Sequence, residues 1–126
     1  MRDPIEIYRA SLQLLPERSE TEPPRIVRAE VWPYPDLTRL WVRVEITPFA
    51  AYPNMLLTAL GADGIEVASM LMVEIREPYQ SVTLHLRREP RPGERYRMEI
   101  ELARDEVALD RRSVDFDLLF KEPGAA

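Results

Sequence analysis

The sequence contains no cysteine and only one histidine, His85, among its 126 residues. Without cysteine the chain can form no disulfide and has no thiolate nucleophile. One histidine and no cysteine also leave too few ligands for a zinc or other transition-metal site. A cysteine-free chain suits a reducing compartment. We therefore expect a cytoplasmic protein that carries no cofactor.

Long apolar runs and basic clusters are missing as well. No stretch approaches the ~20 apolar residues that a membrane-spanning helix needs, and residues 1–4 lack the apolar run of a signal peptide. The formal net charge is −5, Lys121 is the only lysine, and the arginines alternate with acidic residues, as in 94–99. An acidic chain without a basic stripe disfavours nucleic acid. We expect neither a membrane nor a nucleic acid among its partners.

Residue patterns that carry catalysis are equally scarce. The glycines form neither a phosphate-binding loop nor a dinucleotide fingerprint, no serine lies in a Gly-x-Ser-x-Gly motif, and His85 has the outward parity of a strand. Acidic residues gather near the C-terminus, but arginines lie among them and the spacing of an EF-hand loop is absent. These acidic residues are Asp105, Glu106, Asp110, Asp115 and Asp117. The sequence predicts a salt-bridged loop there and a protein that is not an enzyme.

Alternation between apolar and charged residues is what the sequence has in abundance. In 38–47, for example, Leu40, Val42 and Val44 alternate with charged neighbours. Period-two alternation indicates a strand with one buried face, and such strands pair antiparallel. Six further segments have strand character: 26–32, 55–60, 65–76, 82–87, 94–103 and 114–120. Short strands separated by turns in this way predict an all-β sandwich of antiparallel sheets.

Charges indicate the register of the first predicted hairpin. If residues whose numbers sum to 73 face each other, Glu30 lies opposite Arg43 and Arg28 lies opposite Glu45. A slip of two residues in either direction would oppose like charges, and a slip of one would turn the apolar residues outward. The apolar pairs of this register are Val31–Val42, Ala29–Val44 and Val27–Ile46. We predict this register, with a turn at 33–37.

The N-terminal segment has a different pattern. Asp3 and Pro4 suit the start of a helix, which would end at Pro16. Apolar residues recur at helical spacing between them, namely Ile5, Tyr8, Leu12 and Leu15. A strand over 5–14 is the alternative, and the sequence does not decide between the two. The predicted division is an N-terminal helical segment with a polar linker (1–24), the sandwich domain (25–121) and a tail (122–126).

The stretch Pro92-Gly93-Glu94-Arg95-Tyr96-Arg97-Met98-Glu99-Ile100 resembles the turn and sixth strand of fibronectin type III domains. That family has a Pro-Gly-x-x-Tyr turn, and the hydroxyl of its corner tyrosine bonds to upstream backbone. The resemblance implies that Tyr96 is this structural tyrosine and that 82–86 is the fifth strand. The family's core tryptophan in the second strand is not matched, because Trp41 is in phase with charged residues. We predict an all-β, about seven-stranded antiparallel immunoglobulin- or fibronectin-III-like sandwich, a fold that implies a binding or spacer module.

A second hairpin, around Gly61–Gly64, has apolar residues on both faces. With pairs that sum to 125, Met55 faces Met70. Because a sandwich strand has only one core face, the second apolar face must be covered by something. We expect Met55, Leu57, Met70 and Met72 to form an outer face through which the chain associates with itself as a homodimer, or with another protein. The alternative is that these residues belong to the core.

Trp32 and Trp41 raise the same question on the first hairpin. The register given above places them opposite each other, on the face that carries the charged residues. Two large rings side by side, with Tyr34 close in sequence, form a flat platform of the kind that stacks on sugars. The alternative function is therefore a carbohydrate- or small-ligand-binding module with Trp32, Tyr34 and Trp41 as its platform. Burial of the rings in the core is the competing interpretation.

Overall fold

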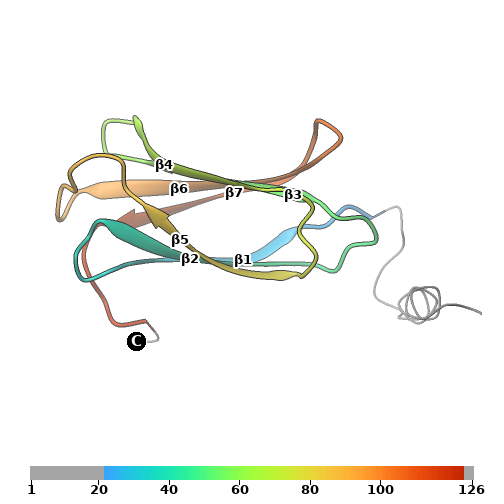
Figure 1. Ribbon diagram of the computed structural model, residues 1–126, viewed down its shortest axis with the longest axis horizontal. Helices are drawn as coiled ribbons and strands as arrows, with labels where there is room; N and C mark the ends of the chain where they lie inside the picture. The colour runs from blue at the N-terminus through green and yellow to red at the C-terminus, as the bar shows by residue number, and fades with distance from the viewer. Residues whose placement is uncertain (1–21, 124–126) are drawn as a thin grey trace, which may run out of the picture.

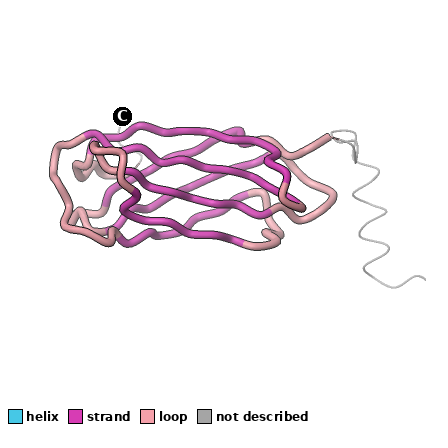
Figure 2. The backbone as a smooth tube through the Cα atoms, turned by 90° about the horizontal axis from the view of Figure 1, so that it is seen from above, coloured by secondary structure: helices cyan, strands magenta, loops and turns pink. Residues whose placement is uncertain are grey.

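The computed structural model describes residues 22–123, which form seven strands along the long axis of the molecule (Figures 1 and 2). The strands are β1 (Ile26–Pro33), β2 (Arg39–Ile46), β3 (Asn54–Leu60), β4 (Glu66–Met72), β5 (Tyr79–His85), β6 (Arg95–Arg104) and β7 (Val107–Asp117). Every segment predicted to be a strand overlaps one, although β5 and β7 begin earlier than predicted, at Tyr79 and Val107. The predicted helix over 3–16 lies outside the described residues. In the described part of the chain, no helix could cross a membrane.

The strands form two antiparallel sheets that stack face to face (Figure 1). One sheet has the order β1-β2-β5, and the other has the order β4-β3-β6-β7. At the two sides of the sandwich, β1 contacts β7 and β4 contacts β5. The prediction of an all-β antiparallel sandwich is confirmed, and the strand arrangement is compatible with an immunoglobulin-like domain.

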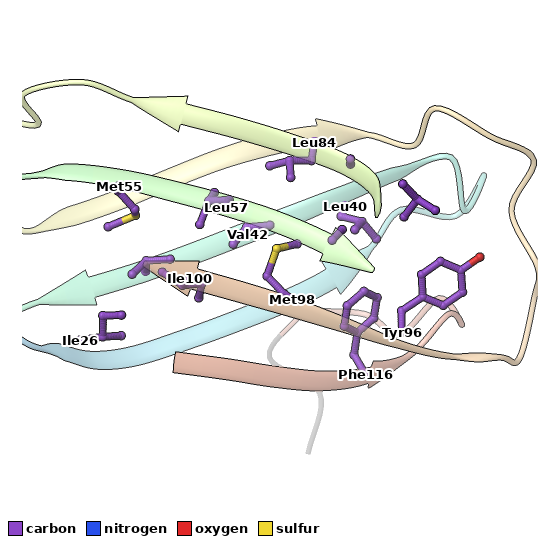
Figure 3. Packing of buried hydrophobic residues seen from close by; sticks show 14 of the residues in the cluster. Ile26, Leu40, Val42, Met55, Leu57, Leu84, Tyr96, Met98, Ile100 and Phe116 are labelled. Carbon is purple, nitrogen blue, oxygen red and sulfur yellow. The ribbon is translucent and has the colours of Figure 1, made fainter. Parts of the chain in front are cut away.

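Apolar side chains from both sheets fill the space between them (Figure 3). In β2, Leu40, Val42 and Val44 are buried, whereas Trp41 and Arg43 alternate with them and are only half-buried. Apart from the hydroxyl-bearing Tyr96, no polar or charged side chain among residues 22–123 is fully buried. The fold therefore depends on apolar burial, which stabilises by roughly 25 cal/mol for each Å² removed from water.

The corner tyrosine inferred from the resemblance is present. Tyr96 is 1% exposed, and its hydroxyl accepts a hydrogen bond of 3.2 Å from the backbone N–H of Arg91. Its ring packs against Phe116, with the ring centroids 5.9 Å apart. The prediction for Tyr96 is confirmed, because the hydroxyl joins the sixth strand to the chain upstream of its turn.

The predicted register of the first hairpin is confirmed except at its open end. Glu30 lies opposite Arg43, and the two tryptophans lie opposite each other. The expected pair of Val27 with Ile46 is wrong, because a bulge before Arg28 brings Ile26 opposite Ile46 instead. Val27 is left 48% exposed. A bulge places two residues of one strand against one of the other, which no alternation of the flanking residues signals.

The predicted register of the second hairpin is wrong by two residues. Met55 lies opposite Met72 rather than Met70, so the pairs along β3 and β4 sum to 127. Gly64 has a φ of 80°, which lets it add one residue to the turn. The register shifts again opposite Ala59 and Leu60, where Val67 and Ala68 are both buried. Two single-residue insertions therefore account for the difference.

The expectation of an outer face formed by Met55, Leu57, Met70 and Met72 is also wrong. A shift of two residues keeps these side chains on one face, but that face is the core. Met55 and Leu57 are fully buried, and Met70 and Met72 are partly buried against the same cluster (Figure 3). Leu56 and Leu71 occupy the outward positions of these strands instead. Association as a homodimer remains a prediction, and these four residues in the folded chain do not offer a surface for it.

The predicted acidic loop near the C-terminus is largely strand. β7 begins at Val107, directly after a tight turn in which Asp105 and Glu106 have φ values of 51° and 65°. Two consecutive positive φ angles are typical of a type I′ hairpin turn. Asp115 pairs with Arg97 on β6 at 2.9 Å. The expectation of a loop was wrong because inward-facing positions of this edge strand carry charges, which hides the alternation.

An ion pair whose titration can be measured joins the turn of the second hairpin to the chain that follows β5. Arg88 lies 2.9 Å from Asp63 and lowers the pKa of that carboxyl from 3.8 to about 2, helped by the backbone N–H of Ile65. Because the pKa is lower in the folded chain, the ionised carboxyl stabilises the fold above 3.8, and this contribution is lost as the pH falls toward 2.

We expect the wild type to lose unfolding free energy across this acidic range, and Asp63→Asn to lose less. Urea unfolding at a series of pH values, with NMR titration of the Asp63 carboxyl, measures both quantities. Asp105→Asn, in the β6–β7 turn, is the matched control and should behave like the wild type. An Asp63 carboxyl that titrates at its ordinary value in the folded protein would contradict the prediction.

Candidate functional site

The outer face of the three-stranded sheet brings together the aromatic residues predicted to form a platform. Trp32 on β1 lies directly opposite Trp41 on β2, and Trp41 lies opposite Thr83 on β5. Both tryptophans are half-buried, and their neighbours Leu40 and Val42 point the other way into the core. The interpretation of the tryptophans as core residues is therefore not what the structure shows.

Arginine side chains lie against the aromatic rings of this face. The guanidinium carbon of Arg39 is 4.2 Å from the ring centroid of Tyr34. Arg43 lies between two rings, 5.0 Å from the centroid of Trp41 and 5.5 Å from that of Tyr79. Such contacts contribute ~0.5–1 kcal/mol each at exposed sites. The rings and guanidinium groups therefore form one alternating array, which we call the aromatic platform.

Hydrogen bonds hold the rings of the aromatic platform in place. The indole N–H of Trp41 donates to Oγ of Ser81 at 2.7 Å. The indole N–H of Trp32 donates to Oε2 of Glu30 at 3.2 Å. The hydroxyls of Tyr34 and Thr83 share a bond of 2.9 Å. Because Ser81 and Thr83 belong to β5, this strand orients rings that belong to the first hairpin.

Charges border the tryptophans on one side. Glu30 lies 2.6 Å from Arg28 and 3.5 Å from Arg43. The hydrogen bond from the Trp32 indole, and then the bond from Arg28, hold the pKa of Glu30 below its usual range. Glu30 therefore stays ionised at neutral pH. A shallow depression in this face is lined by Arg28, Glu30, Arg43, Glu45 and Tyr79.

Tyr79 is the member of the platform that sequence reasoning missed. It begins β5, lies opposite Glu45, and its hydroxyl accepts a hydrogen bond from Nε of Arg43. The Tyr79 ring is exposed beside Arg43. The predicted strand began only at Val82, so Tyr79 fell outside it. The pairing of β5 with β2, which places Tyr79 beside Arg43, cannot be read from the local sequence.

His85 and the acidic residues of β7 do not converge on one site. His85 ends β5 in the three-stranded sheet, opposite Arg39. Asp115 and Asp117 lie on β7 in the other sheet, where Arg97 and Arg95 pair with them. A catalytic site needs convergent groups around a pocket. Among residues 22–123, the aromatic platform offers stacking surfaces and guanidinium donors, which suit binding.

Comparison with known proteins finds similar folds but no related sequence family. The sequence matches no protein-family model and no curated protein. Solved structures do resemble it. A β-glucuronidase from Ruminococcus gnavus superposes with a TM-score of 0.52 at 16% identity, covering 75% of this chain and 16% of that chain. A glycosyl hydrolase family 2 member from Bacteroides cellulosilyticus DSM 14838 has a TM-score of 0.55 at 12% identity, covering 76% and 15%.

A third similar structure is the FMN-binding β-glucuronidase from Facaelibacterium prausnitzii L2-6, with a TM-score of 0.51 and 16% identity. It covers 71% of this chain and 14% of that chain. At such identities the likeness concerns the fold alone. The chain spans about one sixth of the length of these enzymes. The likeness therefore identifies the class of fold, a β-sandwich, and in these enzymes the matching region makes up only part of the chain.

Proposed function

We propose that this chain is a non-catalytic sandwich module that binds a carbohydrate, or a small ligand of similar shape, on the aromatic platform. The observation that carries the proposal is the placement of Trp32, Trp41 and Tyr34 on one open sheet face, with their polar atoms bonded to neighbouring side chains. The likeness to part of several glycosidases supports a sugar-related role. Neither observation requires the chain to catalyse a reaction.

Chemistry of the platform fits a sugar better than a large apolar ligand. The C–H face of a pyranose stacks on an aromatic ring, while its hydroxyls need hydrogen-bond partners at the ring edges. Arg43 and Glu30 supply a donor and an acceptor beside the tryptophans. The face is shallow, so a ligand would bury only part of its surface. We therefore expect weak binding, because little buried area offsets the entropy lost on association.

The test is binding of a panel of oligosaccharides, containing neutral glucosides and glucuronides, followed by tryptophan fluorescence and NMR. We expect at least one glycan to shift the indole resonance of Trp41. We expect Trp41→Ala to weaken binding of that glycan about ten-fold or more, equivalent to ~1.4 kcal/mol. Loss of the stacked ring is the physical reason.

Tyr52→Ala is the matched control for this experiment. Tyr52 is also an exposed aromatic residue with an arginine, Arg76, over its ring, but it lies in the loop before β3. Its substitution should leave glycan binding unchanged. Urea unfolding of Trp41→Ala shows whether the variant is folded under the binding conditions. A folded Trp41→Ala protein that binds as well as the wild type would disprove the proposed platform.

A further inference from the structure

The outer face of the four-stranded sheet carries an exposed apolar patch on one side. Leu56 on β3 lies directly opposite Leu71 on β4, and Val73 follows β4. These side chains are 39%, 61% and 64% exposed, respectively. We call Leu56, Leu71 and Val73 the β3–β4 patch. The far side of the same face differs, because ion pairs such as Arg97–Asp115 cover it.

β4 is also an edge strand, and its second half carries no charged residue. The sheet order places it at one end of β4-β3-β6-β7. The six residues 68–73 include no charged residue and no proline, the features that natural edge strands use to avoid unwanted pairing. Arg87 contacts the first half of the strand, through Glu66, Ser69 and the carbonyl of Val67. Among residues 22–123, the outward side of the second half of β4 therefore continues the exposed β3–β4 patch, while Met70 and Met72 point toward the core.

The chain that precedes β1 enters the sandwich at the same end as this region. Arg25 and Thr47 exchange hydrogen bonds of 2.9 and 2.8 Å, which ties the N-terminal side of β1 to the loop before β3. That loop ends at Pro53, whose carbonyl accepts a bond from Ile75 just after β4. Figure 1 shows the starts of β1 and β3 at one end of the molecule.

The distance between the two places is within reach of the N-terminal segment. β1 lies beside β7, three strand positions from β4. Strands lie ~4.8 Å apart and stacked sheets ~10 Å apart, so the path from β1 to the outer side of β4 is about 25 Å. The ten residues 16–25 can span at most about 33 Å, at ~3.3 Å each. Residues 5–15 would then lie over the patch, and six of these eleven are isoleucine, leucine or tyrosine.

We infer that residues 5–15 of this chain pack on the β3–β4 patch and cover the open half of β4. The aromatic platform is a poorer partner for this segment, because arginines and ion pairs occupy it. A second copy of the chain is also a poorer partner. A tethered segment acts at an effective concentration in the millimolar range, above the micromolar concentration of a free copy.

The test is a double-mutant cycle in the full chain, which avoids truncating a segment whose loss could unfold it. Leu71→Ser changes the patch, and Leu12→Ser combined with Leu15→Ser changes the segment. Urea unfolding gives the unfolding constant of each variant and of the combination. We expect each change alone to raise the constant about ten-fold, and the combination to raise it at least five-fold less than the product.

Val107→Ser provides the matched control, since Val107 is similarly exposed at 59% but lies on β7. The factor by which Val107→Ser raises the unfolding constant should multiply with the factor for the segment changes, because the two sites do not touch. If the unfolding constant of the combined variant equals the product expected from Leu71→Ser and the segment changes, the two sites are not coupled and the inference is overturned. Light scattering measures the solution mass, which shows whether the segment that covers the patch belongs to the same chain or to a second copy. Coupling in a monomer supports the inference, whereas coupling found only in a dimer and lost on dilution would overturn it.

Discussion

Replacing Leu57 by alanine is expected to lower the free energy of unfolding by about 2–5 kcal/mol. Leu57 is 0% exposed at the centre of β3, opposite Ile100 on β6 and Met70 on β4. Removal of its side chain leaves a cavity between the two sheets, and the tight packing around it limits collapse (Figure 3). Because small domains are stable by roughly 5–15 kcal/mol, the loss is a large share of the total.

Leu56→Ala is the matched control, since the two leucines are neighbours in sequence and face opposite sides of the sheet. Leu56 is 39% exposed, so its truncation should cost less than about 1 kcal/mol beyond any contact with residues 5–15. Urea unfolding measures both variants. Equal losses for the two substitutions would mean that the inward face of β3 is not the one containing Leu57.

Truncation of Tyr96 should have an effect of similar size. We expect Tyr96→Ala to lower the free energy of unfolding by about 3–5 kcal/mol, because the ring is buried against Phe116. Tyr96→Phe keeps the ring and removes only the hydroxyl that accepts the Arg91 N–H. The loss for phenylalanine should be about 1–2 kcal/mol, the usual cost of leaving a part-buried donor without its partner.

Comparison of Tyr96→Phe with Tyr96→Ala separates the contribution of the Arg91–Tyr96 hydrogen bond from that of ring packing. Tyr52→Phe, at an exposed tyrosine, should change the unfolding free energy by less than about 0.5 kcal/mol. Amide hydrogen exchange at Arg91 gives an independent readout, since its N–H should exchange faster in Tyr96→Phe than in the wild type. A Tyr96→Phe protein as stable as the wild type, with unchanged exchange at Arg91, would show that the hydroxyl bond contributes nothing.

Local signals account for the parts of the fold that could be predicted. Alternation over 38–47 predicted β2, because period two places one set of side chains on one face. Opposite charges at Glu30 and Arg43 predicted the first register, since like charges would face each other after a slip of two. The Pro-Gly-x-x-Tyr turn predicted the Tyr96 corner. Each of these signals lies within one or two neighbouring strands.

The candidate site was predicted only in part, because it joins residues of one hairpin to residues of a strand that is distant in sequence. Trp32 and Trp41 belong to one hairpin, so their pairing followed from the local register. Tyr79 and Ser81 reach the same face from β5, and Tyr79 is separated from its partner Arg43 by 36 residues. No local pattern states that β5 pairs with β2. The array of rings and arginines therefore became visible only when the three strands were placed side by side.

By itself, the sequence determined that this chain is an all-β antiparallel sandwich and how its first hairpin pairs, because side-chain periodicity and cross-strand charge are properties of the local chain. Only the tertiary structure decided which apolar face of β3 and β4 is the core. Both faces of that hairpin are apolar, so periodicity cannot rank them. The answer came from the second sheet, which covers Met55 and Leu57 and leaves Leu56 and Leu71 outside.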